Sequence, residues 1–281
     1  MVSKMKVNSE ERYSKEKLEE VNWTKTIALT VVFTALVFAV TSIFYVKLSS
    51  TGYFNVGETM VYLSALIGGP IIGAIAGGIG SALADISLGT YLFAPATLVL
   101  KGLEGFVVGY LYQISRSTNK KARYIISSSS IALMIGLGAW LITKTLEVGF
   151  TIAFTKKTYK YDIPGYWLFI SAILLSIFTI VTLFFLGEKG KMIFSCVSGG
   201  TIIVVGYFLY ELALRKVLAV TIGLIAGEVP FNILQVLVGI TFAVPIATAL
   251  HKMGITEDLS ETKRFLLKSK APVYDTLRAK K

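Results

Sequence analysis

Apolar runs of about twenty residues recur along this 281-residue chain, and they constrain its fold more than any other feature. A helix needs about 20 apolar residues to cross the ~30 Å hydrocarbon core of a bilayer. The runs lack the strict apolar and polar alternation of outer-membrane barrel strands, which favours helices. The composition agrees, because 54% of the residues are hydrophobic, 16% are charged and the mean hydropathy is +0.69. The sequence therefore predicts an all-α fold, a polytopic transmembrane helical bundle.

Polar breaks divide the apolar sequence into about eight predicted spans, at residues 26–46, 57–68, 70–86, 91–114, 124–146, 165–186, 192–214 and 221–250. The second span is short, since residues 57–68 would rise only about 18 Å as a helix. One kinked helix over residues 57–86 is therefore an alternative. A hairpin that breaks at Gly68-Gly69-Pro70 is favoured, because it places most of the basic residues on one side of the membrane.

The basic residues also predict the orientation of the bundle. With the hairpin, the N-terminal arm and the tail lie on the same side as the loop that contains Arg116, Lys120, Lys121 and Arg123, and the positive-inside rule makes this side the cytoplasm. Some basic residues then fall outside and weaken the fit, namely Lys144, Lys156, Lys157, Lys160, Arg215 and Lys216. The net charge of +11 is interpreted as topology signals and contacts with anionic lipid, not as nucleic-acid binding. We expect a multi-pass protein of the cell membrane with both termini in the cytoplasm.

The chain has one cysteine, Cys196, and one histidine, His251. This excludes an internal disulfide and leaves no Cys/His cluster for zinc or haem. Cys196 lies in an apolar run and is interpreted as a packing residue. We expect no metal site and no cofactor.

Four ionisable residues stand inside apolar, glycine-rich sequence: Glu58, Asp85, Lys101 and Glu104. A charged group near the middle of a membrane costs about 2.5 to 3.5 kcal/mol, so such groups usually face a protein interior or a watery cavity. Lys101 and Glu104 are three apart on one predicted helix and either pair with each other or bind a ligand. Glu58 and Asp85 lie near predicted external ends, where they either meet a ligand or are solvated.

A second polar group occurs in the last predicted span. Glu228, Asn232 and Gln235 stand at positions i, i+4 and i+7, which places them on one stripe of an apolar helix. Their donors and acceptors suit a heterocycle with amide or hydroxyl edges, and hydrogen bonding between helices is the alternative. Pro230 is expected to open the helix near Glu228. Two further acids, Glu147 and Glu211, are interpreted as solvated caps.

Small residues four positions apart recur in three spans, as Gly69, Gly73 and Gly77, as Gly105 and Gly109, and as Ala35 and Ala39. Such spacing lets helix backbones approach closely where lipid supplies no hydrophobic drive. For the glycines, tight internal packing is favoured over a pliable, gating hairpin. For the alanines, both docking of a partner helix and internal packing are open.

Taken together, these segments resemble the substrate-binding S components of energy-coupling factor (ECF) vitamin transporters, most closely the riboflavin-type group. The resemblance rests on NVGE at residues 55–58, GAIAGGIGSALAD at 73–85, APAT at 94–97, KGLEG at 101–105 and EVP at 228–230 with Asn232 and Gln235. Ala35 with Ala39 is similar to the small-residue motif with which S components dock their partner.

The resemblance implies a substrate-specific membrane subunit of an ATP-driven importer, which captures a vitamin or related small heterocycle, riboflavin-like, outside the cell. It implies no enzymatic activity, and it implies a transmembrane scaffold subunit and two ATPase subunits as partners in trans. The chain has no G-x-x-x-x-G-K-[ST] loop, so ATP must be used by another chain. The expected substrate-binding residues are Asn55, Glu58, Asp85, Lys101, Glu104, Glu228, Asn232 and Gln235, and the expected docking residues are Ala35 and Ala39.

The sequence departs from the family in two respects. Glu58 stands where Asp is commoner, and family members usually have six spans, so two helices are expected to be inserted. The expected organisation is a cytoplasmic N-terminal arm (1–25), four core spans (26–123), an inserted transmembrane helix pair (124–191), the last two core spans (192–250) and a cytoplasmic tail (251–281).

The sequence also bears on two other classes of function. An intramembrane enzyme is disfavoured, because the sole histidine lies at the cytoplasmic end of the last span and Asp-rich diphosphate-binding motifs are absent. An ion-coupled secondary transporter, in which Lys101, Glu104 and Glu228 relay protons, is the stronger alternative.

Overall fold

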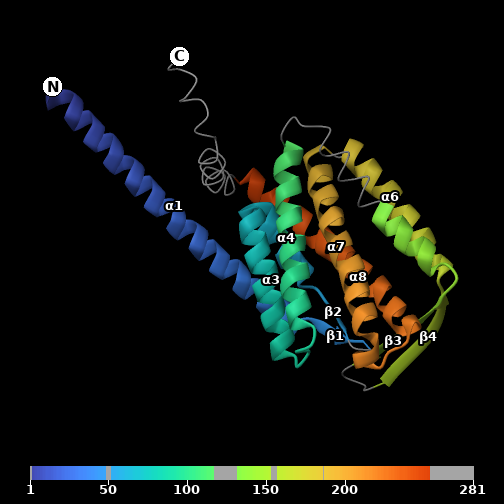
Figure 1. The fold of residues 1–281 in the computed structure, drawn as a ribbon. Coiled ribbons are helices and arrows are strands. Elements are labelled where there is room, and N and C mark those ends of the chain that lie inside the picture. The colour runs from blue at the N-terminus through green and yellow to red at the C-terminus, as the bar shows by residue number, and fades with distance from the viewer. Residues whose placement is uncertain (1, 49–51, 117–131, 153–156, 186, 254–281) are drawn as a thin grey trace, which may run out of the picture.

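The computed structural model describes residues 2–48, 52–116, 132–152, 157–185 and 187–253, which form a bundle of helices with two small β-hairpins at one end (Figure 1). The elements are α1 (Val2–Ile43), β1 (Tyr45–Lys47), β2 (Tyr53–Asn55), α2 (Glu58–Leu63), the π-helical turn η1 (Ser64–Gly68), α3 (Pro70–Ser87), α4 (Ala94–Arg116), a helix at Ala132–Leu141, β3 (Thr145–Ile152), β4 (Lys157–Pro164), α6 (Tyr166–Phe185), α7 (Gly187–Leu218) and α8 (Ile222–Lys252).

Helices long and apolar enough to cross a membrane are present, as predicted. Within the described part of the chain there are five of them, at Trp23–Ile43, Pro70–Ser87, Ala94–Ser115, Gly187–Leu218 and Ile222–Lys252. Two shorter apolar helices occur at Glu58–Gly68 and Ala132–Leu141. The prediction of a polytopic helical bundle is confirmed.

Residues 57–87 form a hairpin, so the alternative of one kinked helix is wrong. Gly69 separates η1 from α3 with φ +88°, a left-handed conformation that favours glycine, and Pro70 then begins α3. A Cβ atom added at Gly73 would lie 2.8 Å from the Cβ atom of Ala65, which shows that α3 returns alongside η1. The short helix α2 is almost wholly buried between its neighbours, so it has no need to match the thickness of a bilayer.

Glycines let α3 and α4 approach until their backbones nearly touch. A Cβ atom at Gly73 would lie 2.7 Å from the carbonyl oxygen of Gly105, and one at Gly77 would lie 2.8 Å from the carbonyl oxygen of Lys101. At the other end of the contact, a Cβ atom at Gly109 would lie 2.5 Å from the nitrogen of Pro70. Real Cβ atoms do not approach other atoms so closely, so the glycine spacing serves tight internal packing.

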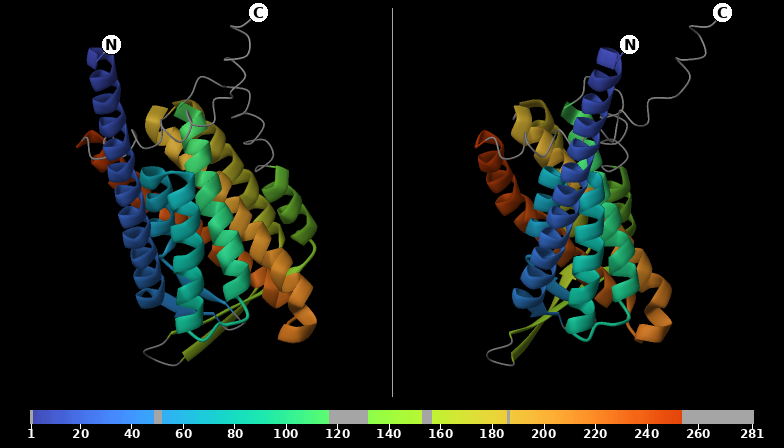
Figure 2. Two further views of the ribbon diagram at one scale, coloured as in Figure 1. Left: turned by 60° about the vertical axis from the view of Figure 1, so that its left-hand side comes forward. Right: turned by 90° about the vertical axis from the view of Figure 1, so that its left-hand side faces the viewer.

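The first helix, α1, is continuous over residues 2–43 and roughly 63 Å long at 1.5 Å per residue. Its C-terminal half packs on α3, where a Cβ atom at Gly80 would lie 2.7 Å from the carbonyl oxygen of Thr34. Its N-terminal part extends away from the bundle (Figures 1 and 2). Ala35 is exposed and Ala39 is half-buried, so part of this small-residue face is uncovered.

The segment between α4 and α7 differs from the predicted helix pair. The helix at Ala132–Leu141 ends before the predicted end of its span at residue 146, and an antiparallel hairpin of β3 and β4 follows, with Thr145 paired to Pro164. The alternation of buried and exposed side chains explains why a strand forms here, because Leu146 and Val148 are buried whereas Glu147 is exposed. The start of the predicted span, at residues 124–131, lies outside the described residues.

This segment packs on the side of the bundle opposite α1 (Figures 1 and 2). Helix α6 contacts α7, and β3 contacts α8. Gly227 makes room for β3, since a Cβ atom there would collide with the backbone oxygen of Glu147. The Glu147 carboxylate also accepts a 2.8 Å hydrogen bond from Thr221, which caps the N-terminus of α8. Glu147 is thus exposed, as expected, but it has a structural contact.

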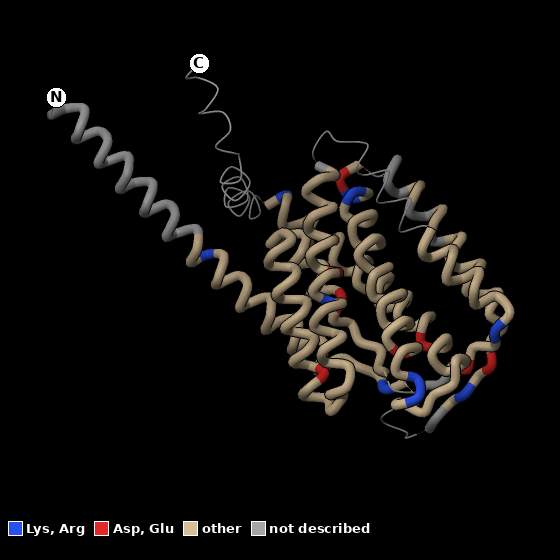
Figure 3. The backbone as a smooth tube through the Cα atoms, in the orientation of Figure 1, with Lys and Arg blue, Asp and Glu red and all other residues tan. Residues whose placement is uncertain are grey.

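Charged residues of the described chain gather at the two ends of the bundle, apart from a small cluster inside it (Figure 3). Three of the loop residues on which the orientation depends, Lys120, Lys121 and Arg123, lie outside the described residues, as does the predicted tail from residue 254 onward.

The close contact of α3 and α4 predicts a strong penalty for one added methyl group. Gly73→Ala should lower stability by about 1–3 kcal/mol, because the facing backbone of Gly105 is unable to move aside alone. Thermal unfolding in detergent, followed by tryptophan fluorescence, measures the effect. Gly136→Ala is the matched control, since its Cβ atom meets nothing within 4 Å and alanine favours the helix. Equal unfolding temperatures for the two variants would contradict the packing described here.

Candidate functional site

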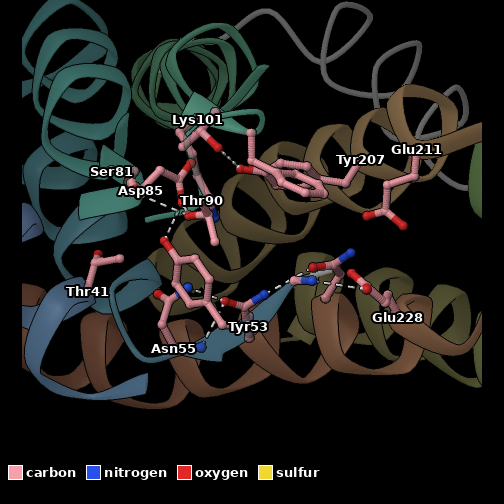
Figure 4. A pocket seen from close by; sticks show the side chains of 15 residues that line it. Thr41, Tyr53, Asn55, Ser81, Asp85, Thr90, Lys101, Tyr207, Glu211 and Glu228 are labelled. Atoms are coloured by element: carbon pink, nitrogen blue, oxygen red, sulfur yellow. Dashed lines mark hydrogen bonds between the residues drawn. The ribbon is translucent and has the colours of Figure 1, made fainter. Parts of the chain in front are cut away.

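A cavity opens inside the bundle toward the end where β1, β2, β3 and β4 lie (Figure 4). Fifteen of the described residues line it, and they come from α1, the β1–β2 connection, β2, α3, the connection between α3 and α4, α4, α7 and α8. In this conformation its volume is about 50 Å³, room for a few water molecules. Most of the lining side chains are polar, in a chain whose other interior residues are mainly apolar.

Asp85 forms one wall of the cavity near the C-terminal end of α3. Its Oδ1 atom accepts a 2.6 Å hydrogen bond from the Tyr53 hydroxyl and a 3.1 Å hydrogen bond from Thr90. Burial raises the pKa of the Tyr53 phenol, and the neighbouring Asp85 raises it further. Tyr53 therefore stays protonated and acts as a donor. These contacts fix β2 against α3 across the cavity.

Side-chain amides form the opposite wall. The Gln235 Oε1 atom accepts hydrogen bonds from the Asn55 backbone nitrogen at 3.1 Å and from Asn55 Nδ2 at 2.6 Å. Gln235 Nε2 donates to Asn232 Oδ1 at 3.0 Å, and Asn55 Oδ1 accepts from the nitrogen of Gly57 at 2.8 Å. The polar stripe of α8 thus faces inward, as predicted. Some of its hydrogen-bonding groups are used to hold β2.

Two acids from different helices meet at the far end of the cavity. Glu211 of α7 and Glu228 of α8 are buried there and lie close enough for their carboxyl groups to interact (Figure 4). Glu228 Oε1 accepts a 3.2 Å hydrogen bond from the nitrogen of Gly52. The interpretation of Glu211 as a solvated cap is wrong, because only 2% of its surface is exposed. Helix α8 also runs unbroken through Pro230, which was expected to open it.

A cluster of charges lies between the cavity and the core. Lys101 forms ion pairs with Glu58, its closer partner, and with Glu104 at 3.5 Å. The Tyr62 hydroxyl donates a 2.9 Å hydrogen bond to Glu104. All of these side chains are buried, and the pairing of Lys101 with Glu104 was one of the two open alternatives. The structure adds Glu58, which the sequence did not link to Lys101.

The structure brings the eight predicted site residues together in one region. Six of them line the cavity, namely Asn55, Asp85, Lys101, Glu228, Asn232 and Gln235. Glu58 and Glu104 lie behind Lys101 and hold it. Further residues that the sequence did not predict also line the cavity, among them Thr41, Tyr53, Ser81, Thr90, Thr97 and Tyr207. Serine, threonine and tyrosine are common in membrane helices, so nothing in the sequence distinguishes these six residues as candidates. Glu211 differs from them, because it shows the same feature as the other buried acids, an ionisable residue in apolar sequence.

The side chains offer hydrogen-bonding groups rather than a metal site. No group of three or more His, Cys, Asp or Glu side chains suited to a metal ion occurs among the residues that the structure describes. The arrangement suits the reversible binding of a polar molecule, with Thr97 and Tyr207 adding a hydroxyl pair 2.8 Å apart.

Comparison with known proteins identifies a family and a relative. A family model described as "ECF-type riboflavin transporter, S component" matches residues 21–186. An "Uncharacterized protein in gap 3'region" from Pyrococcus woesei is 40% identical over 90 residues, which make up 32% of this chain and 58% of that protein. The chain thus spans less than two thirds of the length of that relative. The matched family range ends just before α7, so the division into core spans and an inserted segment stays a prediction.

The buried charge cluster predicts a large loss of stability when its cation is removed. Lys101→Met leaves Glu58 and Glu104 buried without a counter-charge, which should cost about 3–5 kcal/mol in thermal unfolding measurements. Adding Glu58→Gln to Lys101→Met should restore part of the stability. The control Lys191→Met breaks an exposed pair with Glu188 and should cost no more than about 1 kcal/mol. A loss at Lys101 as small as that at Lys191 would contradict the assignment.

Proposed function

Since the chain belongs to the family of S components of ECF-type riboflavin transporters, we propose that it is the membrane subunit that captures the substrate of such a transporter. The polar cavity within the apolar bundle is the observation that carries this proposal. Ionisable groups are costly inside a membrane protein, so they mark a binding site or a pathway. The family is one of transporter components, not of enzymes.

The substrate is a vitamin or a related small heterocycle, bound by residues that line the cavity or support it: Asn55, Glu58, Asp85, Lys101, Glu104, Glu228, Asn232 and Gln235. Amide and carboxyl groups of β2, α3 and α8 supply donors and acceptors that match ring edges. Sites for small molecules usually have about 300–1,000 Å³, so binding requires the lining to move apart from its present arrangement. Strand β2 lies between α3 and α8, where Tyr53 donates to Asp85 and Asn55 donates to Gln235, and its displacement would enlarge the cavity.

We place the cavity on the external side and both termini in the cytoplasm. The hairpins, the α3–α4 connection and the α7–α8 turn lie at the cavity end of the bundle, whereas α1 extends from the opposite end (Figure 1). Helices α4 and α8 end at that opposite end, at Arg116 and Lys252, and in the sequence the basic loop and the basic tail follow them, which agrees with the positive-inside rule.

The scaffold subunit docks on α1, and two ATPase subunits supply the energy in trans. Ala35 and Ala39 offer a small-residue face on α1 that allows close approach of a partner helix. The described part of the segment between α4 and α7 packs on α7 and α8 instead, on the side of the bundle opposite α1 (Figure 2).

An ion-coupled transporter is a second candidate, favoured by the buried cluster of Lys101, Glu58 and Glu104. The two candidates differ in their need for partners. Uptake into vesicles that contain this chain alone, and that stops when the proton gradient collapses, would support the ion-coupled transporter and contradict the S component.

Loss of the α8 side chains should abolish ligand capture. Native mass spectrometry of the purified chain should detect a co-purified small molecule in the wild type, and Glu228→Ala with Asn232→Ala should lose it, with a fall in affinity of roughly 100-fold or more from the loss of two polar contacts. Thr241→Ala, on the exposed side of the same helix, is the control and should retain the molecule. Retention by the double variant would refute the site.

Larger side chains on the α1 face should disrupt partner docking without changing ligand binding. Ala35→Leu with Ala39→Leu should reduce co-purification of the scaffold and ATPase subunits at least roughly tenfold, because the helices are held apart. The retained ligand should be unchanged. Ala139→Leu makes the same change at an exposed position on the opposite side of the bundle. If both variants assemble like the wild type, α1 is not the docking face.

A further inference from the structure

The hairpin of β3 and β4 is anchored to the bundle at its base. The Gly165 nitrogen donates a 2.8 Å hydrogen bond to the Lys144 carbonyl oxygen, which joins the two ends of the hairpin. A Cβ atom at Gly165 would lie 2.6 Å from the same oxygen, so this close approach requires glycine. Thr145 and Pro164 then form the first pair of the two strands. The hairpin therefore starts from a fixed point, at the same end of the bundle as β1 and β2 (Figure 1).

Strand β3 fits against the N-terminal part of α8, where two glycines make room for it. A Cβ atom at Gly227 would collide with the carbonyl oxygen of Glu147 and lie 2.8 Å from its carbonyl carbon. At Gly223, one turn earlier, a Cβ atom would collide with the Glu147 carboxylate. Leu146 and Val148, on either side of Glu147, are buried. Glu147 is therefore the point at which β3 is seated on α8.

The side chain of Glu147 also fixes the first turn of α8. The Thr221 hydroxyl donates a 2.8 Å hydrogen bond to the Glu147 carboxylate, and its oxygen accepts a 3.1 Å hydrogen bond from the nitrogen of Leu224. A hydroxyl group can donate and accept at once, so the two bonds are compatible. Thr221 is the N-cap of α8, so the strand and the helix are tied together where the helix begins.

The same stretch of α8 carries part of the cavity wall. Glu228 follows Gly227 directly, lines the cavity and accepts a 3.2 Å hydrogen bond from the nitrogen of Gly52. Gly52 lies in the connection between β1 and β2, and β3 itself contacts β1. The β1–β2 hairpin is therefore linked to β3 in two ways, by direct contact and through α8.

We infer that Glu147 is a positioning residue of the cavity: by seating β3 on α8 it fixes Glu228 and holds the β1–β2 hairpin in place beside the cavity. Displacement of β2 would enlarge the cavity, so the seat of β3 sets how readily a molecule from solution enters. The inference rests on the proposed function only for the identity of that molecule, which is the substrate of the transporter. Loosening the seat should therefore speed entry into the cavity.

A thiol placed in the cavity wall measures this entry without any substrate. Ser81 lines the cavity and is 3% exposed, so Ser81→Cys combined with Cys196→Ala puts the only thiol of the chain there. The measurement is the rate at which a small methanethiosulfonate reagent labels the purified full-length chain in detergent. Adding Gly227→Ala should raise this rate at least roughly tenfold, because the new methyl group displaces β3 from its seat.

Variants of Glu147 separate its positioning role from a general loss of stability. Glu147→Ala removes the acceptor for Thr221 and should raise the labelling rate roughly threefold to tenfold. Glu147→Gln keeps an acceptor oxygen and should stay within about twofold of the reference chain. Val244→Ala removes buried volume toward the other end of α8 and lowers stability there, and it should also stay within about twofold.

Amide hydrogen exchange of the same variants locates the loosening. In Gly227→Ala and Glu147→Ala, exchange should become faster in peptides that cover β1 and β2, because these strands lose a contact that holds them. Exchange in α3 and α4 should not change, since neither helix depends on the seat of β3.

The outcomes separate this inference from the proposed function. An unchanged labelling rate in Gly227→Ala, or faster exchange confined to β3 and β4, would overturn the positioning role and leave the S component standing. A rate raised as much by Val244→Ala as by Glu147→Ala would assign the effect to lost stability and would also overturn it. A chain that captures no small molecule would contradict the proposed function, whereas the labelling rates would still decide the role of Glu147.

Discussion

The buried ion pairs of Lys101 are the interaction on which the inner architecture depends. One lysine of α4 holds Glu58 of α2 and Glu104 of its own helix, and Tyr62 of α2 donates to the same Glu104. Each of these groups would be costly in hydrocarbon without its partner, so α2 must lie against α4 for the bundle to form. Gly239 of α8 completes the arrangement, since a Cβ atom there would lie 2.7 Å from the Cβ atom of Glu58.

Close backbone contact gives the polar side chains their fixed positions. The glycines of α3 and α4 bring the two helices together, and this sets Asp85 and Lys101 on the same side of the cavity. Strand β2 is then held between Asp85 and Gln235, from opposite walls, by hydroxyl and amide hydrogen bonds. The cavity is thus shaped both by helix packing beside it and by hydrogen bonds among its own lining residues.

Much of this arrangement follows from local sequence, and the rest depends on contacts between distant segments. Apolar runs predict the helices, and the spacing of Glu228, Asn232 and Gln235 predicts a stripe that does face inward. The hairpin of β3 and β4 was missed, because its alternating residues follow directly on an apolar helix and its short length resembles a loop. Glu211 was misjudged because its depth depends on how far α7 extends past the cavity.

The pairing of Lys101 with Glu58 was equally beyond local reading. The two residues are far apart in sequence, and only the return of α3 along η1 and α2 brings them together. The hydroxyl residues of the wall, such as Thr41 and Tyr207, were likewise not predictable from local sequence, because contacts between distant segments bring them to the cavity. What the sequence does reveal is the anomaly of an ionisable residue in apolar surroundings, and that anomaly identified most of the carboxyl groups of the wall.

The continuity of α1 has a mechanical consequence. Thr41, which touches the cavity, stands two residues before the end of a helix that begins at Val2 and has no break between. Sharp kinks in helices arise almost always at proline, at glycine or at a bulge, and α1 contains no proline or glycine, so we expect its embedded and protruding parts to move together. A push on the protruding arm is therefore delivered directly to one wall of the cavity, with no intervening joint to absorb it.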